Sequence, residues 1–115
     1  MIDFACKKFN LDEIVKCGLG LTKAELIIMK YFMKNPRVEF NSNEVSKELK
    51  LNLTTIQRAV KKLYGKKIIL RHQKNLGSGG YIYTYEASAK KDVRDILKAI
   101  IKRWSSKVED EIDLW

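Results

Sequence analysis

Eight basic side chains gather in one stretch of this 115-residue sequence, and their type and spacing suit contact with a polyanion. Between Glu48 and Glu86 the chain carries no Asp or Glu, although acidic residues occur before and after this stretch. Such a segment presents positive charge without neutralisation from within, which favours phosphate groups as partners. The basic residues in it are Lys50, Arg58, Lys61, Lys62, Lys66, Lys67, Arg71 and Lys74.

The sequence contains no pattern that is typical of a metal site or of a catalytic site. Cys6 and Cys17 are its two cysteines and His72 is its one histidine, so the spacing of a zinc site is absent. The sequence contains no nucleophile elbow, no phosphate loop and no paired-carboxylate site. We therefore expect no catalytic residue, no metal and no cofactor, and an enzyme is the function that the sequence supports least.

Length and composition predict one small domain. A chain of 115 residues can bury one core without disulfides or a structural metal. Because the N-terminus resembles no secretory signal and no apolar stretch approaches about 20 residues, we expect a cytoplasmic protein that does not enter a membrane. In a reducing cytoplasm its cysteines are thiols. The formal net charge of +9 favours nucleic acid as the partner.

Charge is distributed unevenly along the chain. All 23 Lys and Arg residues lie at or before Lys107, whereas residues 109–113 contribute four acidic side chains. An acidic end of this kind is most often a solvated helix terminus. The sharper alternative is that it competes with nucleic acid for the basic face of its own or a neighbouring subunit.

Start and stop signals divide the first half of the chain into helices. Apolar residues at helical spacing, followed by two glycines, predict a short helix over residues 4–17. Thr22 with Glu25 forms a capping box ahead of a strongly apolar helix that an Asn-Pro pair ends. Asn41 with Glu44 forms a second capping box, which predicts another helix.

A third capped helix follows about three residues after the second one ends, with Asn52 as its cap. Its apolar positions, Ile56, Ala59, Val60 and Leu63, recur at helical spacing and predict a core-facing side. Two capped helices with so short a join are typical of a helix-turn-helix, whose second helix enters the major groove of DNA. The side chains that we expect a groove to meet are Asn52, Thr54, Thr55, Gln57, Arg58, Lys61 and Lys62.

These residue types suit contacts with both bases and phosphates. Arg58 can form a bidentate pair with guanine and Gln57 with adenine, whereas Thr54 and Thr55 can reach a thymine methyl group or a phosphate. The two lysines suit phosphates, since an ammonium group lacks the fork geometry of a guanidinium. A solvated helix face is the alternative for a surface of this composition.

A β-hairpin with a flexible tip is predicted next. Residues 68–70 and 81–85 are β-prone, and the loop at residues 75–80 contains three glycines. Tyrosines alternate along the second run, and we expect them to pack on the core, with a platform for unpaired bases as the alternative. The hairpin side chains that we expect to contact a sugar-phosphate backbone are Arg71, His72, Lys74, Asn75 and Ser78.

A long helical pattern opens at Ser88 and would run about 37 Å to Ile112. Its apolar stripe is longer than one small domain can cover, so we expect a partner helix to cover part of it. The pattern does not distinguish a dimer from a tetramer. The stripe residues expected to join subunits are Val93, Leu97, Ile100, Trp104 and Val108.

Four segments carry a resemblance to a known family. The segments LGLTKAE (19–25), NEVSKEL (43–49), LTTIQRAVKKL (53–63) and GYIY (80–83) resemble small archaeal winged-helix regulators related to the TrmB and MarR families. The resemblance implies a homodimeric, cytosolic transcription regulator with a recognition helix beginning at Leu53 and a wing at residues 71–81. Lys67 stands where such sequences usually have Gly. The resemblance does not extend to the sugar-binding domain of full-length TrmB proteins, so it implies no sugar effector.

The predicted fold is mainly α with a β-hairpin wing, a winged helix-turn-helix. We expect residues 1–18 to form an N-terminal helix that contributes to dimerisation, residues 19–86 to bind DNA, and residues 87–115 to form the long dimerisation helix. The expected function is a sequence-specific regulator that binds double-stranded DNA as a homodimer, with its two recognition helices about one DNA turn, ~34 Å, apart. The alternatives are a protein-interaction module in a transcription or chromatin assembly, and a sequence-independent architectural or single-strand binder.

Overall fold

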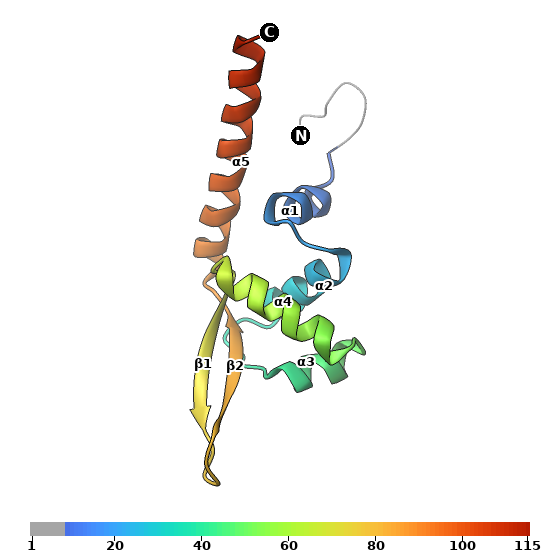
Figure 1. Ribbon diagram of the computed structural model, residues 1–115, viewed down its shortest axis with the longest axis vertical. Coiled ribbons are helices and arrows are strands. Elements are labelled where there is room, and N and C mark those ends of the chain that lie inside the picture. Colours follow the sequence, from blue (N-terminus) through green and yellow to red (C-terminus); the bar gives the residue numbers. More distant parts are fainter. Residues whose placement is uncertain (1–8) are drawn as a thin grey trace.

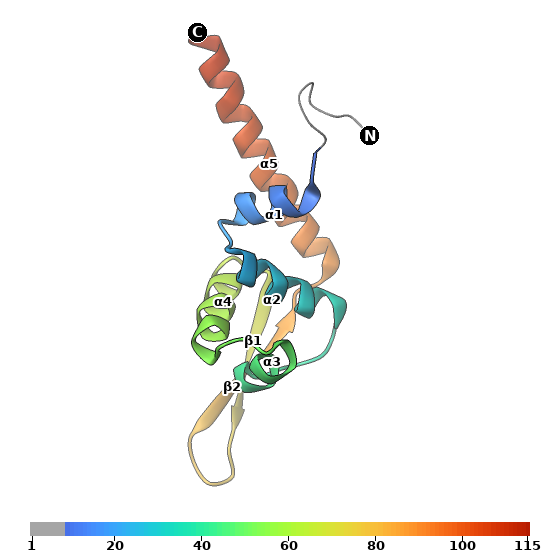
Figure 2. The ribbon, with the colours of Figure 1, turned by 90° about the vertical axis from the view of Figure 1, so that its right-hand side faces the viewer.

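The structure is a computed structural model that describes residues 9–115. Within them, five helices and one antiparallel hairpin form the fold, which confirms the predicted mainly α class (Figure 1). The long helix α5 and the hairpin project from opposite ends of the body, which gives extents of 63 × 24 × 23 Å (Figures 1 and 2). The elements are α1 (Leu11–Leu19), α2 (Lys23–Lys34), α3 (Ser42–Leu49), α4 (Leu53–Gly65), β1 (Ile69–Asn75), β2 (Tyr81–Ala87) and α5 (Lys90–Asp113).

The caps predicted for the three central helices are confirmed. Thr22 and Asn41 each accept a hydrogen bond from the amide three residues later, and the Glu at that position bonds back to the cap amide. Asn52 Oδ1 accepts the Thr54 amide at 2.8 Å and starts α4. Each of these helices therefore starts where its local sequence specifies.

The N-terminal helix begins later than predicted. α1 starts at Leu11 because Asn10 has an extended backbone and its side chain accepts the Glu13 amide, which makes Asn10 the cap. The part of the prediction that falls on residues 4–8, and the prediction for Cys6, lie outside the described residues. Gly20, with a φ of +66°, ends α1 as the sequence indicated.

The core lies where α4 packs against α2, α3 and the base of the hairpin. Phe40 joins the hairpin through an isolated antiparallel bridge, because its amide and carbonyl exchange hydrogen bonds of 2.8 Å with Tyr85. Its ring packs 5.9 Å from that of Phe32 in α2. The largest fully buried side chains are Leu19, Ile28, Phe32, Val45, Ile56, Val60, Leu63, Ile68 and Ile69.

The hairpin strands are longer than predicted. β1 and β2 stay paired from Ile69 with Ala87 to Asn75 with Tyr81, so the loop contains residues 76–80 alone. The sequence pattern underestimated the length of the strands. The polar residues 71–75 gain their β conformation from hydrogen bonds to the opposite strand, which local propensity does not show. As a result, four of the five predicted wing residues lie on β1 and Ser78 lies in the loop.

The long helix begins at Lys90, two residues later than predicted. Ser88 is buried, its amide donates to Ile68 O at 3.0 Å, and its hydroxyl donates to Lys67 O at 2.8 Å. Ser88 therefore still belongs to the hairpin ladder and cannot cap α5. The helix ends at Asp113, and its 24 residues span about 36 Å.

The end of α4 explains why glycine is usual at the position of Lys67. Lys67 has a φ of +64°, and its amide donates to Tyr64 O at 3.0 Å while the Ile68 amide donates to Leu63 O at 3.0 Å. This is the Schellman arrangement that Gly normally occupies, and any residue with a Cβ atom is strained in it. The strain is tolerated here because the turn leads α4 into the first hairpin strand.

Replacing Lys67 with Gly should raise the free energy of unfolding by about 0.5–1 kcal/mol, because relief of left-handed strain exceeds the added entropy of the unfolded chain. Urea denaturation at one protein concentration measures the change. Lys66→Gly is the matched control, since Lys66 has a φ of −93° and should lose stability on the same substitution. Equal effects of the two changes would contradict the explanation.

Candidate nucleic-acid interface

The exposed face of α4 carries most of the side chains that the sequence assigned to DNA. Asn52, Thr54, Gln57, Arg58 and Lys61 are exposed and Thr55 is partly buried. The opposite face of the helix is buried among α2, α3 and the hairpin base. The caps and the apolar periodicity thus fix which way these polar side chains point.

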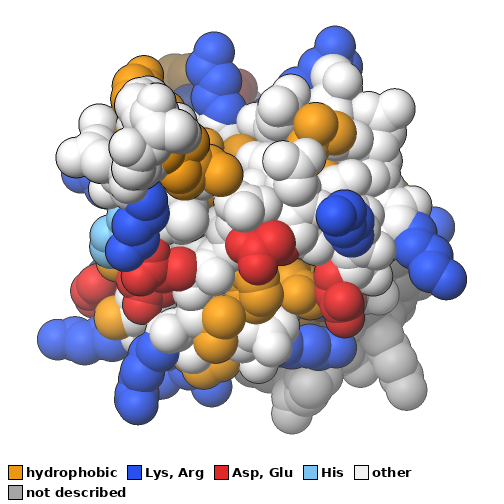
Figure 3. Space-filling view, turned by 90° about the horizontal axis from the view of Figure 1, so that it is seen from below, with side chains coloured by type: hydrophobic (Ala, Val, Ile, Leu, Met, Phe, Trp, Pro, Cys, Tyr) orange, Lys and Arg blue, Asp and Glu red, His pale blue; other side chains and the backbone are white. Residues whose placement is uncertain are grey.

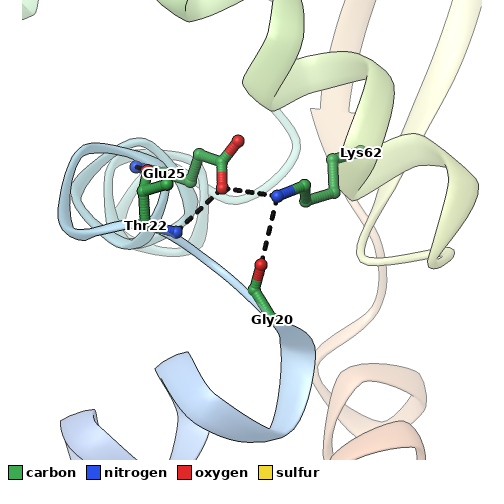
Figure 4. Close-up of polar contacts among 4 residues, drawn as sticks. All are labelled: Gly20, Thr22, Glu25 and Lys62. Carbon is green, nitrogen blue, oxygen red and sulfur yellow. Dashed lines mark hydrogen bonds and ion pairs between the residues drawn. The ribbon is translucent and has the colours of Figure 1, made fainter.

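Lys62 does not lie on that exposed face, contrary to the sequence-based prediction of its position. Its ammonium group turns toward α2 and donates to Glu25 Oε1 at 2.8 Å and to Gly20 O at 3.1 Å (Figure 4). The same carboxylate oxygen accepts the Thr22 amide at 2.8 Å. Lys62 therefore ties α4 to the junction of α1 and α2, and its charge is neutralised there.

This contact depends on a carboxylate that is largely removed from solvent. Burial alone raises the pKa of Glu25, but the hydrogen bonds from Lys62 and from the Thr22 amide outweigh it, so the pKa lies below its ordinary value of 4.5. Glu25 is therefore ionised at neutral pH and serves both as a helix-capping acceptor and as the partner of Lys62.

Arg71 is held between two aromatic rings. Its guanidinium carbon lies 4.4 Å from the ring centre of Tyr64 at the end of α4 and 4.3 Å from that of Tyr83 on β2. Cation–π attraction at such distances favours one orientation of the side chain. Arg71 thus links the end of α4 to the wing, while its exposed position leaves its charge available at the surface.

Two other side chains of the wing, His72 and Lys74, contact acids from outside the basic segment. His72 Nε2 lies 2.8 Å from Glu86 Oε1, and Lys74 Nζ lies 3.2 Å from Glu39 Oε1. Glu39 also accepts the Thr84 hydroxyl at 2.6 Å, and the hydrogen bonds from Thr84 and Lys74 lower its pKa. Seen from the wing tip, acidic side chains interrupt the basic ones on this face (Figure 3). The sequence did not show these pairs, because Glu39 is 35 positions away from Lys74.

The tyrosine row divides into three different environments. Tyr85 packs against the core, where burial raises its pKa, Tyr83 contacts Arg71, and Tyr81 remains 55% exposed beside Tyr83. The predicted packing on the core thus applies fully to Tyr85. Asn75 and Ser78 are exposed near the tip.

A hollow of about 300 Å³ separates the wing from the two helices of the helix-turn-helix. Gln57 of α4 and Tyr81 and Tyr83 of β2 line it. The start of α3 also lines it through Asn41, Ser42 and Asn43. Sequence reasoning used Asn41 as a cap but did not assign this helix start to the site, because its position follows from tertiary packing. A concave surface with polar side chains from both α3 and α4 can receive a backbone strand of nucleic acid.

The stripe residues of α5 divide between the chain's own core and solvent. Val93, which the sequence predicts at a subunit interface, is 3% exposed within its own chain, because it belongs to the chain's own hydrophobic core. Leu97 and Ile100 are partly buried against the same core. Trp104 is 61% exposed and Val108 is exposed, so the uncovered part of the stripe begins near Trp104.

The acidic end lies at the far end of α5 from the wing (Figure 1). It therefore cannot cover α4 of its own chain, which removes one form of the predicted competition with nucleic acid. Among the described residues, no group of three potential metal ligands exists and no helix is long and apolar enough to span a membrane.

Contacts with acidic side chains divide the basic segment into residues that the fold uses and residues that it leaves available. Lys62, His72 and Lys74 have acidic partners. Within residues 9–115, no acidic side chain forms an ion pair with Arg58 or Lys61. These two residues therefore present charge on α4 that the fold does not use.

Comparisons with known proteins agree with this fold. The family model described as the DnaD N-terminal domain matches residues 9–110. A solved structure described as a possible transcriptional regulator from Methanosarcina mazei Go1 is 43% identical, with coverage of 100% of this chain and 96% of that chain and a TM-score of 0.93. An uncharacterised protein of Methanocaldococcus jannaschii is 24% identical over 108 residues, 94% of this chain and 80% of that protein.

A more distant structure shows the fold alone. It is a variant of S. aureus MepR bound to an oligodeoxyribonucleotide, with 13% identity, coverage of 90% of this chain and 72% of that chain, and a TM-score of 0.56. A MarR protein from Peptoclostridium difficile has the same fold. The predicted resemblance to small archaeal winged-helix regulators and to MarR-type proteins is thereby confirmed.

Replacing Lys62 with Met should lower the free energy of unfolding by about 1–2 kcal/mol at pH 7, because a largely buried carboxylate loses its cation. The partial exposure of Lys62 keeps the effect at this modest size. Lys61→Met is the matched control and should change stability little, since Lys61 has no acidic partner among the described residues. Urea denaturation measures both changes.

The pH dependence of the same variant follows from the sign of the Glu25 shift. A folded-state pKa below 4.5 means that the pair's contribution is complete above that value and is lost as pH falls through the folded pKa. The stability difference between wild type and Lys62→Met should therefore shrink in acid. A difference that stays constant as pH falls would mean that packing of the lysine stem, and not its charge, carries the effect.

Proposed function

The chain belongs to the family described as the DnaD N-terminal domain, and from this premise we propose that it is a sequence-specific transcription regulator that binds duplex DNA as a homodimer. The 43% identical structure is described as a possible transcriptional regulator, which supports this class of function. MepR, which shares the fold, binds an oligodeoxyribonucleotide, which supports DNA as the ligand.

The observation that carries the proposal is the exposed polar face of α4. Its side chains have the types that read bases, and its cations Arg58 and Lys61 have no acidic partner among residues 9–115. α4 is about 20 Å long, which suits a segment of the DNA major groove, and its exposed face carries positive charge that the fold does not neutralise. The buried opposite face holds the helix in one orientation.

Each side chain on this face has a role in the proposed complex. Arg58 pairs with a guanine and Gln57 with an adenine, while Thr54 and Thr55 contact a thymine methyl group or a phosphate. Lys61 neutralises a phosphate. Asn52 remains the helix cap through its Oδ1, and its amide nitrogen can donate to the DNA backbone.

The wing supports the complex mainly through its shape. Arg71 and the two acid-paired side chains hold the strands in place, and the exposed Asn75 and Ser78 approach a sugar-phosphate backbone at the tip. The glycines of the loop permit this approach, since Gly79 and Gly80 have positive φ values.

Replacing Arg58 with Ala should weaken binding to the specific duplex about 10- to 100-fold and leave binding to a shuffled duplex nearly unchanged, because a bidentate base contact is lost. The measurement is fluorescence anisotropy with DNA from upstream of the protein's own gene, titrated from low to physiological salt. Arg94→Ala is the matched control, since Arg94 is an exposed arginine on α5 and its replacement removes the same charge.

The outcomes of this titration separate the candidate functions. A sequence preference that survives physiological salt and is lost in Arg58→Ala supports direct reading by α4. Equal, salt-sensitive binding of both duplexes, with equal losses in Arg58→Ala and Arg94→Ala, would mean sequence-independent binding and would overturn the proposal for that DNA. No binding at all would favour the protein-interaction module.

Replacing Trp104 with Glu should convert the dimer to monomers and weaken operator binding, because a charge replaces an apolar side chain at the start of the uncovered stripe. Light scattering of the purified full chain measures the mass. Lys91→Glu is the control for a charge change on an exposed site of α5 near its start. A Trp104→Glu protein that remains dimeric would remove α5 from the interface.

A further inference from the structure

The distal half of α5 presents an apolar face that no described part of the chain covers. Its exposed side chains are Ile101, Trp104, Val108 and Ile112, followed by Leu114 and Trp115. At the base of this face, α1 and α5 enclose an apolar hollow of about 480 Å³. The hollow is lined by Ile14, Cys17, Gly18, Ile100, Ile101 and Trp104.

Charge is segregated along the same half of the helix. Lys98, Lys102, Arg103 and Lys107 precede Val108 with no acidic residue among residues 96–108. Glu109, Asp110, Glu111 and Asp113 follow it with no basic residue after them. No ion pair within 4 Å joins these two groups in the described chain. Each group therefore lacks a partner of opposite sign.

At its C-terminal end, this layout is the reverse of the one that a lone helix prefers. The helix dipole favours acidic residues in the first turn and basic residues in the last, because the two ends carry partial positive and negative charge. α5 begins with Lys90 and Lys91 beside the acidic Asp92, and it has no basic residue in its last turn. The dipole therefore disfavours the acidic last turn of this helix unless a second charged helix lies alongside it.

We propose that two copies of the chain pair through α5 in an antiparallel arrangement, with the two-fold axis close to Ser106. The proposal rests on the homodimer of the proposed function and specifies how the subunits meet. Antiparallel pairing brings the basic segment of each copy beside the acidic end of the other and opposes the two helix dipoles. Parallel pairing would set acid beside acid and base beside base.

The apolar residues fit the same register. Around an axis at Ser106, Trp104 lies level with Val108 of the second copy, Ile100 with Ile112, and Leu97 with Trp115. The charged residues match as well, because Lys102 and Arg103 come level with Asp110 and Glu109 of the second copy. One register therefore satisfies both the apolar stripe and the charges.

The arrangement also fills the hollow between α1 and α5. The C-terminal end of each α5 reaches the level of Leu97 and Ile100 in the other copy, where the hollow lies. Ile112 and Trp115, which are 58% and 103% exposed in one chain, would be buried there. Each copy contributes one hollow and one helix end, as a two-fold interface requires.

The geometry changes one expectation for DNA binding. The first residues of the two α5 helices would stand about 48 Å apart, since each Lys90 lies 16 residues from the axis at ~1.5 Å per residue. The recognition helices would then occupy opposite ends of a rod, farther apart than one DNA turn. The dimer would bind two separated half-sites or two duplexes.

A distance measurement on the full chain tests the orientation directly. In a background of Cys6→Ser and Cys17→Ser, Lys91→Cys carries a spin label for pulsed electron resonance. The antiparallel pair places the two labelled positions about 45 Å apart, because each lies 15 residues from the axis. A separation below about 25 Å, as expected for side-by-side parallel helices, would overturn the proposal. A purely monomeric protein would overturn it too.

Charge reversal provides an independent test. Glu109→Lys with Asp110→Lys should raise the dimer dissociation constant at least tenfold, since basic side chains would then meet the basic segment of the other copy. Adding Lys102→Glu and Arg103→Glu to the same chain should restore dimerisation. In a parallel pair, residues 109 and 110 of the two copies face each other, so the first variant replaces a contact between acids with a contact between bases. Dimerisation of that variant at the wild-type level would therefore contradict the proposal.

Failure of this inference and failure of the proposed function give different results. Sequence-specific binding that depends on Arg58, with a short spin-label distance, would retain the regulator and reject the antiparallel pair. A 45 Å distance with no DNA binding would retain the pair and reject the regulator. Measurements at low and high salt add a further check, because a charge-matched pair weakens as salt rises.

Discussion

Burial of one side of α4 is the constraint on which the rest of the structure depends. Ile56, Ala59 and Leu63 are fully buried, so the helix cannot turn about its axis without exposing them or burying Arg58. Burying each of the larger two contributes roughly 1.5–3 kcal/mol, whereas an unpaired arginine in the same place would cost more than that gain. The capping bond at Asn52, the contact of Lys62 with Glu25 and the turn at Lys67 fix the helix at its start, side and end.

Local signals predicted the elements well because their causes lie within a few residues. The capping boxes at Thr22 and Asn41 and the apolar spacing of α4 each depend on neighbours three or four positions away. The same logic failed at Ser88, where a bond to Lys67 O across the hairpin decides the residue's role. Strand length, helix entry and the position of Lys62 are set by partners that are distant in sequence, and no local pattern contains them.

The basic segment shows how far composition can be trusted. Counting charges from Glu48 to Glu86 treats all Lys and Arg residues as equivalent, but the fold places Glu25 against Lys62 and Glu39 against Lys74. Among the other Lys and Arg residues of the segment, Arg58 and Lys61 lie exposed on α4, so the charge that this helix offers is much smaller than the net charge of +9 suggests. The residues around the site thus serve two purposes, since the paired cations shape the surface that the unpaired ones use.

The aromatic residues are divided between the two ends of the molecule. All five tyrosines lie in the winged body, where Tyr64 and Tyr83 flank Arg71, whereas both tryptophans, Trp104 and Trp115, lie on or just after α5 and are exposed. The two chromophores therefore sample different regions of the protein. Tryptophan emission reports whether the long helix is covered, and tyrosine emission reports events near the wing. Subunit association and ligand contact are spectroscopically separate in the unmodified chain, because the sequence places each kind of fluorophore at one end.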